Sequence, residues 1–165
     1  QSRSSAASDV YKRQWLNSIL ANKVPSKPGR IALCHMLSLN GGVRAEFTVY
    51  RKSRNSFYLV FSGATERHDW DYLNKLLPKH GSINIQNITT QKGVFVIAGP
   101  KSRALLQKLT DTSLDNEHFP WLTGKTMNIG YGIADALRIN FVGELGWELH
   151  HPIAVSYTHL RAHET

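Results

Sequence analysis

The sequence predicts an α+β fold in which antiparallel sheets pack against single helices. Three observations lead to this class. Short runs rich in β-branched and aromatic residues come in neighbouring pairs, strong turn signals join members of a pair, and helical repeats of apolar residues separate the pairs. Strands that pair with their chain neighbours and alternate with single helices are typical of α+β domains. A chain of 165 residues is long enough to bury a sizeable core.

The first expected element is a hairpin around the turn signal Asn40-Gly41-Gly42. Its strands are expected at 29–39 and 43–50. Side chains alternate along a strand, so the second run has an apolar face of Val43, Ala45, Phe47 and Val49, and a polar face of Arg44, Glu46, Thr48 and Tyr50. Glu46 is therefore expected on the polar face. A third strand is expected at 55–63.

A helix is expected from Thr65 to Leu77, with Thr65 as its N-cap. Apolar residues recur there at helical spacing, at Trp70, Leu73, Leu76 and Leu77. Pro78 and Gly81 follow and close the helix. Two short strands are expected after them, at 82–89 and 93–99.

A second helix is expected at 101–109. Pro100 opens it, because proline is favoured at the first helical position. Segment 115–124 is expected to be irregular. The last expected element is a hairpin of 136–143 and 145–151, bent at Gly143.

Both ends of the chain differ from the sequence between them and look like translated cloning sequence. One way of encoding Asp9 to Gln14 has a reverse complement that reads, in a shifted frame, as the start of Val155 to Leu160. Such an inverted repeat resembles the transposase adapters of sequencing libraries, and engineered tails are excluded from fold reasoning. We expect residues 1–14 and 154–165 to be adapter-derived and 15–153 to be an internal fragment whose true termini are missing. The alternative is a natural basic arm.

Composition excludes several kinds of site. The net charge is +8, but basic residues form no run of five, so it is only a weak signal for a polyanionic partner. No stretch approaches 18 apolar residues, so no membrane span is expected. Cys34 is alone, which rules out an internal disulfide. The adjacent His150 and His151 should point to opposite faces of a strand and cannot share a metal. No metal site is expected.

Two glutamates stand out as candidate functional residues. Glu148 is flanked by the apolar Trp147 and Leu149, and burying a carboxylate is costly unless partners hold it. For Glu46 composition favours the alternative of a solvated strand residue paired with Arg44 or Arg51.

Three blocks stand in order along the chain: VRAEFTVYRKSRNSFYLV, FVIAGPKSRALLQKLT and ALRINFVGELGWELHHP. Together they resemble the glycine-cleavage aminomethyltransferase family, in its branch fused to flavin-dependent dimethylglycine and sarcosine dehydrogenases. The last block contains the pattern G-E-x-G-aromatic-E. The resemblance covers essentially all of Trp15 to Ile153, and implies the family's folate-binding fold in partial form.

The resemblance also implies roles for individual residues. Glu46 falls on the family's catalytic carboxylate, usually Asp, which assists proton transfers near the folate nitrogens. Glu148 falls on the residue that grips the pterin ring, since a carboxylate can accept two parallel hydrogen bonds. Phe141, Val60 and Glu144 are further cofactor-binding candidates. Phe141 stands where many members carry Tyr, and Glu46 is one methylene longer than Asp.

The implied function is tetrahydrofolate-dependent one-carbon transfer. The domain would accept a methylene unit, as an iminium, from dimethylglycine or sarcosine oxidation and give 5,10-methylene-tetrahydrofolate. FAD would be bound by a missing N-terminal part of a parent enzyme, and the fragment alone is expected to be inactive. The expected partners are a small methylamine substrate and folate, with no nucleic acid and no membrane, in a bacterial cytoplasm.

Two alternatives remain open at this point. One is a flavin-free folate-dependent methyltransferase or demethylase of the same family. The other is a non-catalytic nucleic-acid or protein interaction module on this fold, because fold does not determine function.

Overall fold

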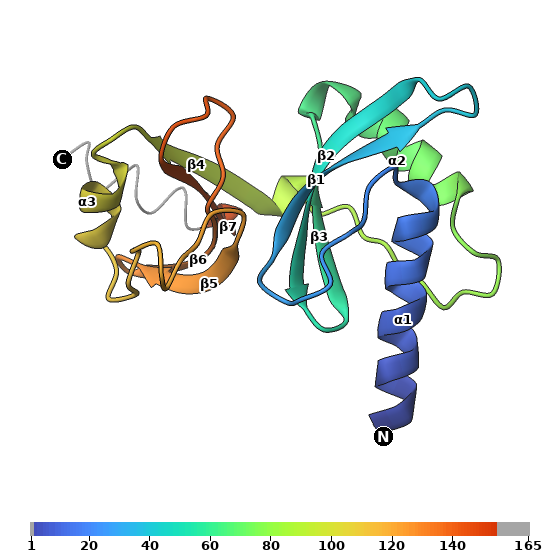
Figure 1. The fold of residues 1–165 in the computed structure, drawn as a ribbon, viewed down its shortest axis with the longest axis horizontal. Coiled ribbons are helices and arrows are strands. Elements are labelled where there is room, and N and C mark those ends of the chain that lie inside the picture. Colours follow the sequence, from blue (N-terminus) through green and yellow to red (C-terminus); the bar gives the residue numbers. More distant parts are fainter. Residues whose placement is uncertain (1, 155–165) are drawn as a thin grey trace. The chain divides into compact units, whose positions relative to one another are not determined.

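The computed structural model describes residues 2–154, with side chains from residue 10 onward. It has the predicted α+β class, with antiparallel sheets and few helices (Figure 1). The chain forms two compact units that divide between Asn87 and Ile88. No helix among the described residues has the length and apolar character needed to cross a bilayer.

The first unit contains a three-stranded sheet in the order β1-β2-β3. Its elements are α1 (Ser2–Ile19), β1 (Ile31–Leu37), β2 (Val43–Ser53), β3 (Ser56–Val60), the 3-10 turn η1 (Gly63–Thr65) and α2 (Glu66–Lys75). The predicted hairpin at Asn40-Gly41 and the third strand are confirmed by antiparallel pairing. The sheet buries a core that includes Cys34, Met36, Phe47 and Val49.

A bulge in the hairpin corrects one part of the predicted alternation. Met36 lies opposite Ala45, but Leu37 lies opposite Val43, so Arg44 is the extra residue. Such a bulge disrupts the ladder and bends the strand. Val43 is accordingly exposed, although the pattern placed it on the apolar face. Tyr50, predicted on the polar face, is buried, and it lies between Ile31 of β1 and Tyr58 of β3.

Helix α1 crosses the predicted boundary between adapter tail and natural chain. Its last turns bury Trp15 and Leu16 in the first core, and Trp15 Nε1 donates to the Leu76 carbonyl at 2.8 Å. Lys12, in the predicted tail, donates to the Asn55 carbonyl at 3.0 Å. The adapter origin of residues 1–14 stays a prediction. The tail predicted at 154–165 lies outside the described residues apart from Ala154.

The predicted N-cap of α2 is correct in position and wrong in mechanism. Thr65 is the N-cap residue, but its side chain caps no backbone N–H. Its hydroxyl instead donates to Asp69 Oδ2 at 2.6 Å. The buried Asp69 is one turn further along the helix, so the hydroxyl satisfies a buried carboxylate.

The strand predicted at 82–89 is absent, because this segment has no pairing partner. Its alternation is nevertheless reflected in packing, since Ile83 and Ile85 pack against the first core. Alternating burial without a neighbouring ladder gives an extended segment and no strand.

The second unit is a four-stranded sheet in the order β4-β7-β6-β5. Its elements are η2 (Thr89–Gln91), β4 (Lys92–Ala98), α3 (Ser102–Gln107), β5 (Gly124–Ile129), β6 (Gly132–Leu137) and β7 (Gly146–Pro152). One face packs a core that includes Leu106, Phe119, Met127 and Trp147.

The strand predicted at 136–143 is largely wrong. Strand β6 begins at Gly132 and ends at Leu137. It pairs along its whole length with β5, a strand that the sequence pattern did not predict. The Ile139 N–H donates to the Leu137 carbonyl at 2.8 Å, a tight turn that ends the strand. Residues 138–145 therefore form a loop, and β7 pairs with β6 over only a short stretch.

Candidate functional site

Glu46 lies on the exposed face of the three-stranded sheet, as predicted. Its cross-strand partner is His35, and His35 Nε2 lies 2.8 Å from Glu46 Oε2. The side chains are 36% and 53% exposed respectively. Both are therefore within reach of a ligand.

The expected arginine pairing of Glu46 is replaced by this histidine. Arg44 contacts His68 Nε2 at 2.8 Å and lies over the Tyr72 ring. Arg51 is buried and donates to backbone carbonyls, including that of Ser26 at 2.5 Å. These contacts direct both guanidinium groups to other parts of the first unit.

Val60 lies on the same sheet face as Glu46. Val60 of β3 lies opposite Thr48 of β2, and Thr48 lies opposite Leu33 of β1. Cross-strand partners share a face, and Thr48 is two residues from Glu46. The row formed by Leu33, Thr48 and Val60 thus runs beside His35 and Glu46, and Leu33 is 49% exposed. The first unit has a carboxylate–imidazole pair bordered by a row of two apolar side chains with a threonine between them.

Glu148 lies on β7 in the second unit, on the sheet face opposite the core residues Trp147 and Leu149. Its side chain is 21% exposed, and its Oε2 lies 3.2 Å from Nε2 of the fully buried His150. Among the described residues, the contacts of this carboxylate leave Oε1 without a protein partner. Glu148 is thus half-buried, held through one oxygen, and open at the other.

Further polar residues share the face of Glu148 and were not found from the sequence. Asp135 of β6 lies opposite His150 and is 4% exposed. Thr126 donates to Asp135 Oδ1 at 2.6 Å, and Lys92 Nζ lies 3.7 Å from Asp135 Oδ2. These residues come from four different strands, so only the sheet order brings them together. Alternation along β7 alone would have placed His150 beside Glu148.

The loop 138–145 carries the two other predicted ligand residues. Phe141 is fully exposed, and Glu144 is exposed. The Glu144 carbonyl accepts a hydrogen bond from Asn140 Nδ2. Gly143 has φ +76, a conformation that favours glycine. Glu144 thus shapes the turn through its backbone.

Gly146 is where this loop meets the sheet. A Cβ there would lie 2.5 Å from the Ile97 carbonyl oxygen and 2.7 Å from Asn140 Nδ2. A methyl group does not fit at that distance, so the glycine permits the close approach of β4 and the loop.

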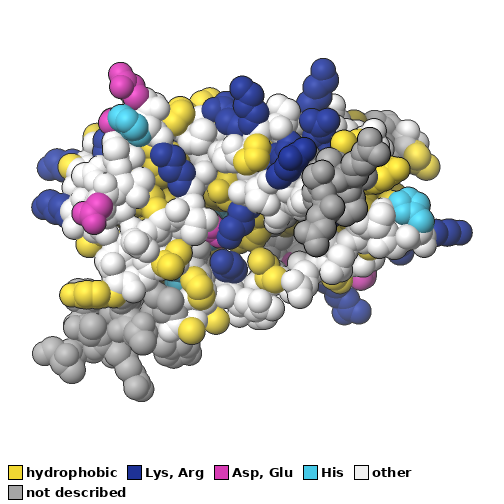
Figure 2. Space-filling view, turned by 90° about the horizontal axis from the view of Figure 1, so that it is seen from below, with side chains coloured by type: hydrophobic (Ala, Val, Ile, Leu, Met, Phe, Trp, Pro, Cys, Tyr) yellow, Lys and Arg dark blue, Asp and Glu magenta, His cyan; other side chains and the backbone are white. Residues whose placement is uncertain are grey.

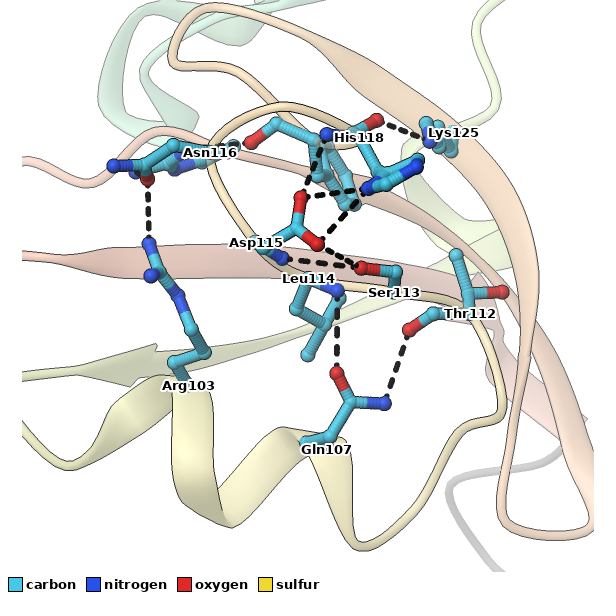
Figure 3. A network of polar contacts seen from close by, with 11 residues as sticks. Arg103, Gln107, Thr112, Ser113, Leu114, Asp115, Asn116, His118 and Lys125 are labelled. Atoms are coloured by element: carbon cyan, nitrogen blue, oxygen red, sulfur yellow. Dashed lines mark hydrogen bonds and ion pairs between the residues drawn. The ribbon is translucent and has the colours of Figure 1, made fainter.

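A second polar network organises the connection between α3 and β5 (Figure 3). Asp115 accepts hydrogen bonds from the Ser113 hydroxyl at 2.7 Å, the His118 backbone N–H at 2.7 Å and His118 Nδ1 at 2.8 Å. These bonds hold the pKa of Asp115 well below its usual range. A carboxylate so fully engaged stabilises the loop and is unsuited to act as a base.

Two arginines share one acceptor in the same region. Asn116 Oδ1 accepts from Arg103 at 2.7 Å and from Arg138 at 2.8 Å, as Figure 3 shows for Arg103. Burial, and secondarily the charge of Arg103, lower the pKa of Arg138. Arg138 also lies over the Trp147 ring, so this cluster braces β7 from the core side.

The described residues also bear on the sequence expectations for the lone cysteine, the adjacent histidines and metal binding. Cys34 is buried in the first core, and its burial raises the pKa of the thiol, with a smaller opposing effect of Asn22. His151 stacks on Phe95 at 4.6 Å, whereas His150 contacts Glu148, so the two histidines face opposite ways. No group of three metal-binding side chains occurs within residues 10–154. Figure 2 shows Lys and Arg interspersed with uncharged side chains.

Comparison with known proteins identifies the family. Residues 11–160 match the GCVT N-terminal domain. The chain belongs to the GCVT N-terminal domain family. The matched range extends slightly beyond the predicted natural segment 15–153 at both ends. The resemblance inferred from three sequence blocks is thereby confirmed.

Proteins similar to this chain include dehydrogenases and aminomethyltransferases. The chain is 40% identical over 139 residues to the mitochondrial dimethylglycine dehydrogenase of Mus musculus, covering 84% of this chain and 16% of that protein. It is 34% identical to the mitochondrial sarcosine dehydrogenase of Homo sapiens, with coverage of 85% and 16%. It is 28% identical to the aminomethyltransferase of Natranaerobius thermophilus, with coverage of 83% and 37%. The chain thus spans about a sixth of the length of the dehydrogenases that it matches.

Proposed function

We propose that this GCVT N-terminal domain binds tetrahydrofolate and transfers a one-carbon unit to it. The donor would be the iminium formed when dimethylglycine or sarcosine is oxidised, and the product 5,10-methylene-tetrahydrofolate. The bond between the methylene carbon and the amine nitrogen would break, and the demethylated amine would leave after taking up a proton. The observation that supports this most strongly is Glu148, a half-buried carboxylate at the end of the G-E-x-G-aromatic-E pattern. Relatives named dimethylglycine and sarcosine dehydrogenase are 40% and 34% identical.

The residues present fit a reduced pterin. The amino edge of a pterin offers N–H donors, and a carboxylate accepts two of them in parallel. Glu148 has Oε1 open to such a donor, while His150 holds Oε2 on the protein side. Oε2 retains acceptor capacity beside that contact. Glu148 would thus orient the ring as well as bind it.

Glu46 would act at the reacting nitrogen. When bound, tetrahydrofolate supplies a nucleophilic nitrogen that must lose a proton after it forms a bond to carbon. The exposed Glu46 carboxylate would accept that proton, and general-base assistance contributes about 10²- to 10⁴-fold in rate. Its negative charge would also stabilise a cationic iminium.

We further propose that the chain is a segment of a longer parent dehydrogenase. FAD would be bound by a part of that parent that precedes residue 15, and the segment alone would be inactive. The parent would act on a small methylamine without nucleic acid or membrane. A bacterial cytoplasmic location is part of this proposal, although the matched dehydrogenases are named as mitochondrial.

An assay of the parent protein tests the function. Dimethylglycine or sarcosine would be oxidised in the presence and absence of tetrahydrofolate, and both methylene-tetrahydrofolate and free formaldehyde measured. With tetrahydrofolate present we expect more methylene-tetrahydrofolate than free formaldehyde. In Glu46→Gln we expect more formaldehyde than methylene-tetrahydrofolate, while substrate oxidation continues. If neither donor is oxidised, the dehydrogenase assignment is wrong. If formaldehyde release is the same with and without folate, one-carbon transfer is wrong.

A further inference from the structure

His35 and Glu46 form a side-chain pair that the sequence pattern did not indicate. They are direct cross-strand partners in β1 and β2, and 2.8 Å separates His35 Nε2 from Glu46 Oε2. Cys34 and Met36 on either side of His35 point into the first core. The pair therefore lies on the outer face of the sheet, together with Thr48.

This pair contributes little to folding stability. Its side chains are 36% and 53% exposed, and exposed polar pairs of this kind contribute little to stability. The stability of the sheet comes from the opposite face, where Phe47 and Val49 are almost completely buried. A role for the pair must therefore be sought on the exposed side.

The backbone of His35 is held from both edges of β1. On one side β1 pairs with β2. On the other, the His35 N–H donates to Asn22 Oδ1 at 3.2 Å, and the Ala21 N–H donates to the His35 carbonyl at 2.9 Å. Asn22 Nδ2 also donates to the Leu33 carbonyl at 2.5 Å. These hydrogen bonds fix the backbone from which the His35 imidazole extends.

Other charged groups near the hairpin are engaged elsewhere. The Arg44 guanidinium contacts His68 Nε2 at 2.8 Å and lies 3.8 Å from the centroid of the Tyr72 ring. Within the part of the chain that the structure describes, His35 is the polar side chain that Glu46 contacts. It restrains one carboxylate oxygen and leaves Oε1 open.

We infer that His35 is the positioning residue for Glu46 in one-carbon transfer, an inference that rests on the proposed function. His35 Nε2–H donates to Oε2 and restricts the side-chain torsions of Glu46, which has one more than Asp. The open Oε1 is then presented to the nitrogen that loses its proton. A charge-assisted bond of this kind supplies orientation as well as energy, and orientation lowers the barrier only when it is fixed in advance.

Two substitutions at His35 in the parent protein test the role. His35→Leu removes the donor, and we expect kcat for methylene transfer to fall about tenfold or more with KM for tetrahydrofolate little changed. His35→Gln keeps an N–H donor at similar reach, and we expect it to recover most of that loss. A purely structural role would lower thermal stability and would not separate kcat from KM. His118→Leu is the matched control, because His118 is an exposed imidazole 2.8 Å from the carboxylate of Asp115.

A second measurement uses the 165-residue chain and needs no turnover. In long-range ¹H–¹⁵N spectra the His35 ring should carry a proton on Nε2, and the Nε2 signal should move in Glu46→Gln. In that variant the His118 signal should stay in place. A His35 signal that is unchanged in Glu46→Gln contradicts the inference.

The possible outcomes separate this inference from the proposed function. If Glu46→Gln abolishes transfer and His35→Leu does not, His35 is not the positioning residue and the function stands. If Glu46→Gln transfers as fast as the unmodified protein, the function assigned to Glu46 fails and the inference fails with it. If His35→Gln is as slow as His35→Leu, hydrogen-bond donation is not what His35 provides, and the inference is overturned.

Discussion

Glu148 and His150 lie two residues apart on one face of β7, with Glu148 Oε2 3.2 Å from Nε2 of the fully buried His150. The imidazole provides the half-buried carboxylate with a polar partner on the protein side. Burying an unpartnered carboxylate is costly, so the contact with His150 lowers the free-energy cost of burying Glu148. The same contact leaves Oε1 available, which is the property that a ligand-holding carboxylate needs.

The first prediction concerns Glu46. Glu46→Gln keeps the size of the side chain and removes its ability to accept a proton, so kcat for methylene transfer in the parent protein should fall about 10²- to 10⁴-fold. Glu117→Gln, at an exposed glutamate of the other unit, is the control and should leave the rate unchanged. Single-turnover measurements of methylene-tetrahydrofolate formation decide the question. A loss below threefold would show that Glu46 is not the base.

Local patterns predicted most of the individual elements. The Asn40-Gly41 turn and alternation along 43–50 indicated the β1–β2 hairpin, and helical spacing in 65–77 indicated α2. The bulge at Arg44 shifts the register by one residue between the turn and Ala45, so the folded hairpin decides that His35 lies opposite Glu46.

Such local patterns did not predict the pairing between segments that are distant in the sequence. The apolar residues of 82–89 alternate as in a strand, but no ladder forms because no partner lies beside them. Strand β5 was missed because Gly124 to Ile129 lacks strong alternation, and it is its pairing with β6 that makes it a strand. Asp135 and Lys92 join the face of Glu148 only through the order β4-β7-β6-β5. The order of strands in the sheet thus determines which polar residues lie near Glu148.

A second prediction concerns Gly146. In Gly146→Ala the new Cβ would lie 2.5 Å from the Ile97 carbonyl oxygen and 3.1 Å from Ala98 Cα. Backbone atoms cannot move aside cheaply, and overpacking typically costs about 1 to 3 kcal/mol. We expect a lower Tm in thermal unfolding of the 165-residue chain. Gly63→Ala is the control, because a Cβ there meets nothing within 4 Å; equal Tm values for the two variants would contradict the packing account.

A third prediction concerns Asp115 and acid. Hydrogen bonds from Ser113 and His118 hold its pKa below the ordinary 3.8. The carboxylate therefore stabilises the folded chain above pH 3.8, and this contribution is lost as pH falls below that value. Asp115→Asn should unfold more easily at pH 7, and the difference should shrink below pH 3.8. Unfolding midpoints of Asp115→Asn and the unmodified chain are compared between pH 2 and pH 7, with Asp111→Asn as control. A difference in midpoint that stays constant over this range would contradict the role of Asp115.

A fourth prediction concerns the acceptor shared by two arginines. Asn116→Leu removes Oδ1, which accepts from Arg103 and Arg138. Leaving the buried Arg138 without this partner should cost about 1 to 3 kcal/mol. Urea unfolding of the 165-residue chain gives the free energy of unfolding. Asn116→Asp, which keeps an acceptor, should retain more stability than Asn116→Leu, and the opposite order would rule out the shared-acceptor role.

Calorimetric titration of tetrahydrofolate into the parent protein and its Glu148→Gln variant tests the central claim most directly. Replacing the carboxylate by an amide removes a charge-assisted interaction worth about 1.5 to 3 kcal/mol, so Kd should rise roughly tenfold or more. The Glu117→Gln protein should bind like the unmodified one. An unchanged Kd in Glu148→Gln would remove Glu148 from the folate site and contradict the account.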